Sequence, residues 1–154
     1  MKSSRKPQEQ DKSRSRCPVN FALEAVGDKW SMLIIRDIVL WGKRYYGEFL
    51  KSAEGISTNI LASRLEFLES IDVLQKMPDE ADKRKDVYRL TEKGLDLIPI
   101  LFSLIEWGGK YGPLAEAQQT PEFKRFKTNP AKFVKEIQEL VRQGGAVWPR
   151  QGES

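Results

Sequence analysis

A polar cluster at the start of one predicted helix contains the residue types that hydrogen-bond to the edges of DNA bases. Gly55-Ile-Ser57 marks a sharp boundary, because glycine commonly ends one helix and serine is a good N-cap for the next. The candidate base-contacting residues are Ser57, Thr58, Asn59 and Ser63. Asparagine can form two hydrogen bonds with adenine, and serine and threonine can donate or accept. On periodicity alone, a capped and solvated helix face explains these residues at least as well.

The helix expected at about 57–70 has one apolar face and one polar face. Counted from Ile60, its apolar arc contains Leu61, Leu65, Leu68 and Ile71. This arc must pack on the rest of the domain, which leaves the polar face free for a partner. Arg64 falls inside the apolar arc, so we expect it to have a structural role at the domain edge.

Three consecutive cations, Lys83, Arg84 and Lys85, follow this helix at a predicted hairpin tip, 78–86. The flanking segments, 73–77 and 86–90, have strand-like composition. A basic hairpin directly after a recognition helix can act as a wing that contacts the DNA backbone or the minor groove. By itself, a Lys-Arg-Lys run indicates only a solvated surface.

Catalytic chemistry is restricted because the chain has no histidine and one cysteine, Cys17. Histidine is the most common general acid–base and transition-metal ligand, so a Ser-His or Cys-His nucleophile is excluded. We therefore expect a protein that is not an enzyme and that has no metal site and no other cofactor. The lone thiol is an inert buried group, a reactive group or an intermolecular bridge.

The charge distribution divides the chain into an arm and a body. Residues 1–16 carry six Lys or Arg and two Asp or Glu. Their net charge of +4 equals the net charge of the whole chain. Residues 17–154 carry twenty of each and are balanced. The arm lacks apolar residues after Met1, which predicts a disordered basic segment. No apolar run reaches the roughly 18 residues that span a bilayer, and no secretory signal is visible, so we expect a cytoplasmic protein.

The predicted elements give a mainly α protein with a small β-hairpin, an α+β arrangement typical of a winged helix-turn-helix. Helices are expected at 19–26, 29–40, 46–53, 57–70 and from Glu92 to about Gly108. The winged helix-turn-helix domain then spans 17–112. The C-terminal extension, 113–154, is expected to have one helix, 131–143, which either closes over the domain or joins a dimer interface. Trp30, Trp41 and Trp107 lie in apolar helical settings and are expected in the core.

The order of these motifs resembles the HxlR-type winged helix-turn-helix regulators, relatives of the MarR-like transcription factors. The resemblance covers about residues 17–112. It rests on Cys17-Pro18, Gly27-Asp-Lys-Trp30, Leu33-Ile-Ile-Arg36, Tyr46-Gly-Glu-Phe-Leu50, Gly55-Ile-Ser57, Leu61-Ala-Ser-Arg-Leu65, Leu68-Glu69, Tyr88-Arg-Leu-Thr91, Lys93-Gly94 and Trp107-Gly108. The hairpin is longer and more charged than is common in the family, and the last forty residues have no counterpart.

The resemblance implies a two-fold homodimer built from the first and last helices of the domain. It implies two recognition helices in successive major grooves, with half-sites about 34 Å apart. It also places Cys17 where some members carry a thiol that senses oxidants or electrophiles.

The favoured function is a sequence-specific, double-stranded DNA-binding transcriptional regulator, acting as a repressor and a homodimer. Two alternatives remain. The near-zero charge of residues 17–154 favours a winged-helix protein-interaction module without specific DNA binding. An enzyme with Cys17 as the nucleophile is disfavoured, because no histidine could activate the thiol.

Overall fold

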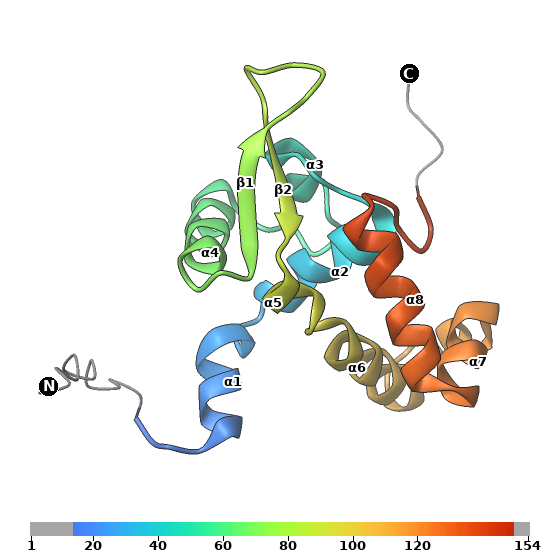
Figure 1. Ribbon diagram of the computed structural model, residues 1–154. Coiled ribbons are helices and arrows are strands. Elements are labelled where there is room, and N and C mark those ends of the chain that lie inside the picture. Colours follow the sequence, from blue (N-terminus) through green and yellow to red (C-terminus); the bar gives the residue numbers. More distant parts are fainter. Residues whose placement is uncertain (1–13, 150–154) are drawn as a thin grey trace, which may run out of the picture.

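The computed structural model describes residues 14–149 and confirms the mainly α fold with one small hairpin (Figure 1). Most of the arm predicted at residues 1–16 therefore lies outside the described residues. In chain order the elements are α1 (Pro18–Val26), α2 (Ser31–Trp41), α3 (Tyr46–Leu50), α4 (Thr58–Ser70), β1 (Leu74–Pro78), β2 (Asp86–Leu90), α5 (Glu92–Leu95), α6 (Ile98–Tyr111), the 3-10 helix η1 (Ala115–Gln119), α7 (Pro121–Thr128) and α8 (Pro130–Arg142).

The helix expected from Glu92 to Gly108 is divided into α5 and α6. Pro99 lies in the first turn of α6, where its missing amide hydrogen leaves no bond unmade. Further into a continuous helix the same ring would clash with the preceding turn. The chain therefore starts a new helix at this point.

The strands β1 and β2 form an antiparallel hairpin in which Leu74 pairs with Leu90 and Pro78 pairs with Asp86. A third segment supports the hairpin, because the Tyr88 amide donates to the Arg44 carbonyl at 2.8 Å. At the base of the hairpin α5 comes very close, and a Cβ at Gly94 would lie 2.2 Å from the Val73 carbonyl oxygen. Only glycine allows this approach of helix and strand.

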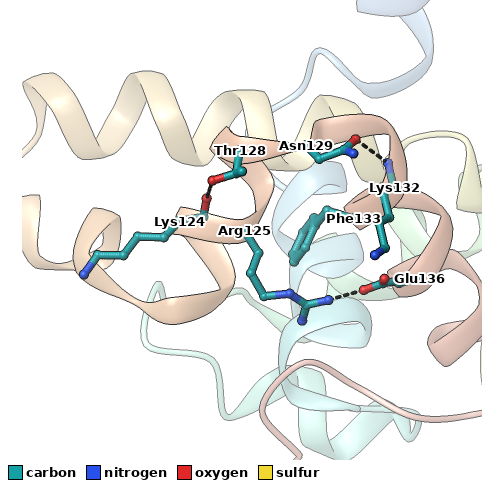
Figure 2. Close-up of a pocket in the computed structure, with 7 residues that line it drawn as sticks. All are labelled: Lys124, Arg125, Thr128, Asn129, Lys132, Phe133 and Glu136. Atoms are coloured by element: carbon teal, nitrogen blue, oxygen red, sulfur yellow. Dashed lines mark hydrogen bonds and ion pairs between the residues drawn. The ribbon is translucent and has the colours of Figure 1, made fainter.

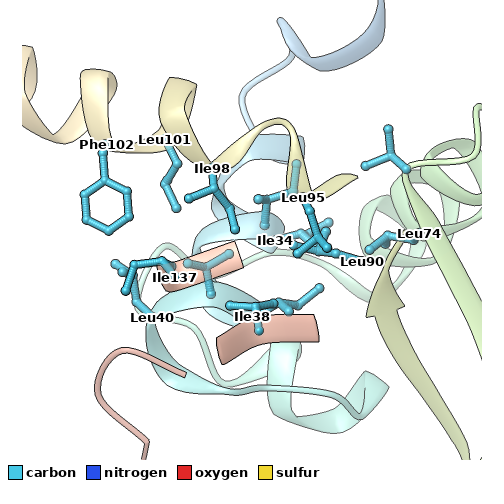
Figure 3. Packing of buried hydrophobic residues seen from close by; sticks show 14 of the residues in the cluster. Ile34, Ile38, Leu40, Leu74, Leu90, Leu95, Ile98, Leu101, Phe102 and Ile137 are labelled. Atoms are coloured by element: carbon cyan, nitrogen blue, oxygen red, sulfur yellow. The ribbon is translucent and has the colours of Figure 1, made fainter. Parts of the chain in front are cut away.

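One hydrophobic core runs from the hairpin to the C-terminal extension (Figure 3). The side chains that meet there come from four parts of the chain: α2 (Ile34, Ile38, Leu40), the hairpin (Leu74, Leu90), α5–α6 (Leu95, Ile98, Leu101, Phe102) and α8 (Ile137). Trp107 is not part of this core. It is 68% exposed, so the expectation of a buried tryptophan there is wrong. Trp41 lies at the surface as well, whereas Trp30 is half-buried against the core.

The C-terminal extension closes over the domain rather than standing apart from it. It contains two α-helices, α7 and α8, where the sequence analysis expected one. The missed helix α7 is capped by Thr120, whose hydroxyl accepts from the Phe123 amide, and it buries Phe123 and Phe126. After α8 the chain returns to α2, where the Val147 and Trp148 amides donate to the Val39 and Leu40 carbonyls at 3.0 and 2.7 Å. These bonds satisfy carbonyls that the end of α2 leaves unpaired.

A buried ion pair lies under the turn between α2 and α3. The Lys43 ammonium is 2.8 Å from the Asp37 carboxylate, and each side chain is only 3% exposed. Lys43 also donates to the Ser52 hydroxyl at 2.7 Å, and Ser52 in turn bonds Asp37. The group therefore joins the end of α2 to the turn that follows α3.

We expect Lys43→Met to destabilise the protein by about 2 kcal/mol, because the buried Asp37 carboxylate loses one of its two cations and keeps only Arg36. The free energy of unfolding can be measured by urea denaturation. Lys51→Met removes an exposed lysine nearby and should change it by less than about 0.5 kcal/mol. Equal losses in the two variants would show that the buried pair contributes nothing specific.

Candidate nucleic-acid interface

The helix-turn-helix consists of α3, a turn at 51–57, and α4. Gly55 has a positive φ of 70°, the left-handed conformation that the sequence analysis expected a helix-ending glycine to supply. Ser57 caps α4, because its hydroxyl accepts from the Ile60 amide at 3.3 Å. The Tyr46 hydroxyl donates to the Thr58 carbonyl at 2.8 Å, which ties α3 directly to the start of α4.

The four predicted base-contacting residues all lie exposed at the N-terminal end of α4. Ser57, Thr58, Asn59 and Ser63 share this surface, while Leu61, Leu65 and Leu68 are buried against the core. Short polar side chains on an exposed helix face allow a partner to approach the helix axis closely.

Ile60 is an exposed apolar residue at the start of α4. It marks the edge of the apolar arc counted above, and 40% of its surface is exposed, next to Asn59. At the edge of an arc, periodicity does not decide whether a side chain is buried. An exposed aliphatic side chain on a recognition helix can contact the methyl group of thymine.

Arg64 lies at the edge of the domain, as expected. Its guanidinium is 3.7 Å from the Asp28 carboxylate and 5.0 Å from the centre of the Phe67 ring. Both contacts are within the protein, which is consistent with a structural role.

The predicted wing residues Lys83, Arg84 and Lys85 are exposed at the tip of the hairpin. Arg84 is paired with Asp82 at 3.0 Å, and the Lys85 ammonium lies 5.9 Å from the centre of the Tyr45 ring. The tip segment, 78–86, also carries four carboxylates, so any attraction for phosphate comes from the local grouping of the cations and not from net charge.

The base of the wing is attached to α3. The Tyr45 hydroxyl donates to the Asp79 carboxylate at 2.7 Å, and this bond raises the pKa of Tyr45 and lowers the pKa of Asp79. The Glu48 carboxylate accepts from the Arg44 and Tyr45 amides at 2.7 and 3.0 Å. The wing is thus attached to the first helix of the helix-turn-helix, and Figure 1 shows α3 beside the upper part of the hairpin.

An ion pair positions the turn that precedes α4. Arg36 on α2 donates to both carboxylate oxygens of Glu54, and it also bonds Asp37 at 2.7 Å. The hydrogen bonds from Arg36 lower the pKa of Glu54 from 4.5 to about 2 and keep it ionised well into acid. The guanidinium is therefore shared between two carboxylates and has no role left toward nucleic acid.

Cys17 lies exposed at the N-cap position of α1. Its amide donates to the Ser15 hydroxyl at 3.3 Å. The thiol is therefore not buried within the single chain. A reactive group and an intermolecular bridge both remain compatible with its position.

Within residues 14–149, no group of three or more histidine, cysteine, aspartate or glutamate side chains could hold a metal ion. No helix in that part of the chain is long and apolar enough to cross a membrane.

Comparison with known families explains this arrangement. The family model described as HxlR-like helix-turn-helix matches residues 25–116, which is more than half of the chain. The chain belongs to this family. The match spans α2 to the start of η1 and thus includes the whole α3–α4 and hairpin surface, but it ends before α7 and α8.

The HxlR-like chain has relatives among bacterial regulators. A protein of Mycobacterium tuberculosis, named an uncharacterized HTH-type transcriptional regulator, is 37% identical over 98 residues, which cover 64% of this chain and 61% of the relative. YdeP of Bacillus subtilis, with the same description, is 32% identical over 95 residues, which cover 62% and 73%. The chain thus spans less than two thirds of the mycobacterial relative.

Two solved structures share the fold of this HxlR-like chain. PA1607, described as a candidate transcription factor, is 42% identical with a TM-score of 0.58, covering 64% of this chain and 68% of that one. The redox regulator HypR in its oxidized form is 28% identical with a TM-score of 0.55, covering 61% and 96%. The winged-helix fold is therefore confirmed.

Proposed function

We propose that this HxlR-like protein is a transcriptional regulator that binds double-stranded DNA sequence-specifically as a homodimer. The observation that carries the proposal is the single surface made by the exposed start of α4 and the attached wing. Membership of the family supports it, as do relatives named as HTH-type transcriptional regulators. Repression, a cytoplasmic location and the absence of catalysis are parts of the same proposal.

In the proposed complex, the start of α4 enters the major groove. Asn59 reads adenine through its amide, and Ser57, Thr58 and Ser63 contact neighbouring base edges. Ile60 packs on a thymine methyl group beside them. The cations Lys83, Arg84 and Lys85 contact phosphates or the minor groove next to the bases that α4 reads.

A second copy is proposed because two apolar surfaces of the described residues have no cover. The helix α1 has no buried residue, and Figure 1 shows it projecting away from the domain. Its exposed apolar side chains are Val19, Phe21 and Leu23, and those of α6 are Ile100, Leu104, Trp107 and Tyr111. The spacing of the second set places it on one face of α6. Pairing of these helices across a two-fold axis removes both surfaces from water.

The recognition surface is tested with DNA from the region upstream of the protein's own gene, by fluorescence polarisation against a scrambled duplex. We expect the Asn59→Ala, Ser63→Ala double variant to lose at least about tenfold in affinity for its site. The double variant Gln119→Ala, Gln143→Ala changes two exposed residues of the extension and should bind as the wild type does.

The wing is tested by the double variant Lys83→Gln, Lys85→Gln. It should weaken binding to every duplex and reduce the slope of log affinity against log salt by about one per lost contact.

Equal and weak binding to every duplex by the wild type and the α4 variant would overturn the proposal. The protein-interaction module would then be the better interpretation.

The dimer is tested by light scattering after size-exclusion chromatography. Leu104→Glu places a charge on the exposed stripe of α6 and should convert the protein from twice the mass of one chain to the monomer mass. Ala131→Glu adds the same charge at an exposed position of α8 and should leave the dimer intact. A wild-type protein that elutes as a monomer at all concentrations would exclude the homodimer.

Oxidant sensing by Cys17 is a further part of the proposal, supported by the exposed thiol and by the similar fold of HypR, a redox regulator. Hydrogen peroxide would join the Cys17 thiols of two subunits as a disulfide, with two molecules of water formed from the peroxide and the two thiol protons. We expect peroxide to change the DNA affinity of the wild type but not of Cys17→Ser, measured together with intact mass. Unchanged affinity of the fully oxidised wild type would exclude this role.

A further inference from the structure

A large apolar cavity lies where the C-terminal extension meets the winged-helix domain. Its volume is about 520 Å³, within the range that accommodates drug-sized molecules. The lining comes from α2 (Arg36, Leu40, Trp41), α6 (Phe102, Ile105, Gly108, Gly109), the following loop (Pro113, Leu114), and the extension (Thr120, Glu122, Phe123, Trp148). The last four residues lie beyond the family match at 25–116. The part of the lining that the extension supplies therefore lies outside the family match.

The cavity is separate from both surfaces proposed above. None of its lining residues belongs to α3, α4 or the hairpin. On α6 the lining residues Phe102, Ile105 and Gly109 lie on the opposite side from the exposed stripe that includes Leu104 and Trp107.

Four of the residues that line the cavity are aromatic. The rings of Trp41 and Trp148 are 5.4 Å apart between centroids and tilted by 41°, while Phe102 and Phe123 are almost completely buried. The backbone bond from Trp148 to the Leu40 carbonyl, 2.7 Å long, holds the Trp148 segment against α2. A flat aromatic molecule can therefore stack against the tryptophan rings.

The two charged residues in the lining are not equivalent. Arg36 already bonds Glu54 and Asp37, so its positive charge is balanced within the protein. Glu122 is half-buried and has no cation within ion-pair distance among residues 14–149. It lies in the first turn of α7, where the backbone dipoles favour a negative charge. The lining therefore includes one carboxylate that has no ion-pair partner among residues 14–149.

A hollow on the outer side of the extension provides a contrast (Figure 2). It is lined by charged groups, but Arg125 is paired with Glu136 and the Asn129 side chain caps α8 at the Lys132 amide, 3.1 Å away. Its one carboxylate is therefore already paired within the chain, and the other charged residues of its lining are the cations Lys124 and Lys132. The Glu122 cavity combines aromatic side chains with a carboxylate that has no ion-pair partner in the described part of the chain, and this hollow does not.

We propose that the cavity binds an organic cation with planar aromatic rings. The faces of Trp41 and Trp148 attract both the rings and the positive charge of such a molecule, and Glu122 supplies the counter-ion. A neutral aromatic compound would leave the carboxylate to be desolvated without compensation, and an anion would be repelled.

The test uses isothermal titration of the full chain with 10-methylacridinium, and with acridine at pH 8 as a neutral compound of nearly the same shape. We expect the cation to bind with one site per chain and more tightly than acridine. Glu122→Gln should weaken binding of the cation about fivefold and leave acridine unchanged. Glu116→Gln removes an exposed carboxylate of η1 outside the cavity lining and should have no effect on either compound.

A second variant locates the site independently of charge. Trp148→Leu should weaken the binding of both 10-methylacridinium and acridine. Circular dichroism verifies that the variant retains the fold. Binding of the cation that is unaffected by both Glu122→Gln and Trp148→Leu would overturn the proposal, as would the absence of binding by the folded wild type. Equal affinity for acridine and 10-methylacridinium would show that the carboxylate selects nothing and would also overturn it.

Discussion

Two opposite charges enclosed almost completely by protein impose the strongest constraint on this structure. Removing an ammonium and a carboxylate from water costs several kcal/mol each, and close contact between them recovers much of that free energy, with Arg36 as a second cation beside the carboxylate. Asp37 and Lys43 achieve this contact because the chain turns sharply after α2, and Ser52 completes the arrangement from the far end of α3. The direction in which α3 leaves α2 is therefore set by electrostatics as well as by packing.

The helix α2 connects the different surfaces of the molecule. On one side its Arg36 pairs with Glu54 in the turn before α4. This ion pair fixes the position of the start of the recognition helix relative to α2. On another side Leu40 and Trp41 form part of the cavity wall under the extension. Since the core is continuous across α2, a change at the cavity and a change at the DNA-facing surface share one rigid element.

Local signals account for what could be predicted from the sequence. The cap at Ser57 and the spacing of Leu61, Leu65 and Leu68 are decided within one helix, and both were confirmed. The exposure of Ile60 was not predictable, because it lies at the edge of an apolar arc. Trp107 lies within the exposed apolar stripe of α6, and whether such a stripe is covered depends on other elements or on another chain. The Thr120-Pro121 pair did indicate the start of α7, but that helix has only eight residues and buries two of them, a weak pattern. The cavity is lined by residues that are distant in the sequence, and the periodicity of a single helix or strand cannot predict contacts between distant segments.

The bonds between the returning C-terminal segment and the end of α2 have a consequence for synthesis of the chain. Arg44 and Gly144, which are joined by a hydrogen bond, are 100 residues apart, and the amides of Val147 and Trp148 reach α2 from equally far along the chain. On the ribosome, α2 and the helix-turn-helix emerge long before the segment that completes them. During that interval Phe102 and the carbonyls at the end of α2 lack their native cover, so a nascent chain interrupted before α8 would expose an unfinished core. Folding to the final structure thus waits until Val147 and Trp148 have been made.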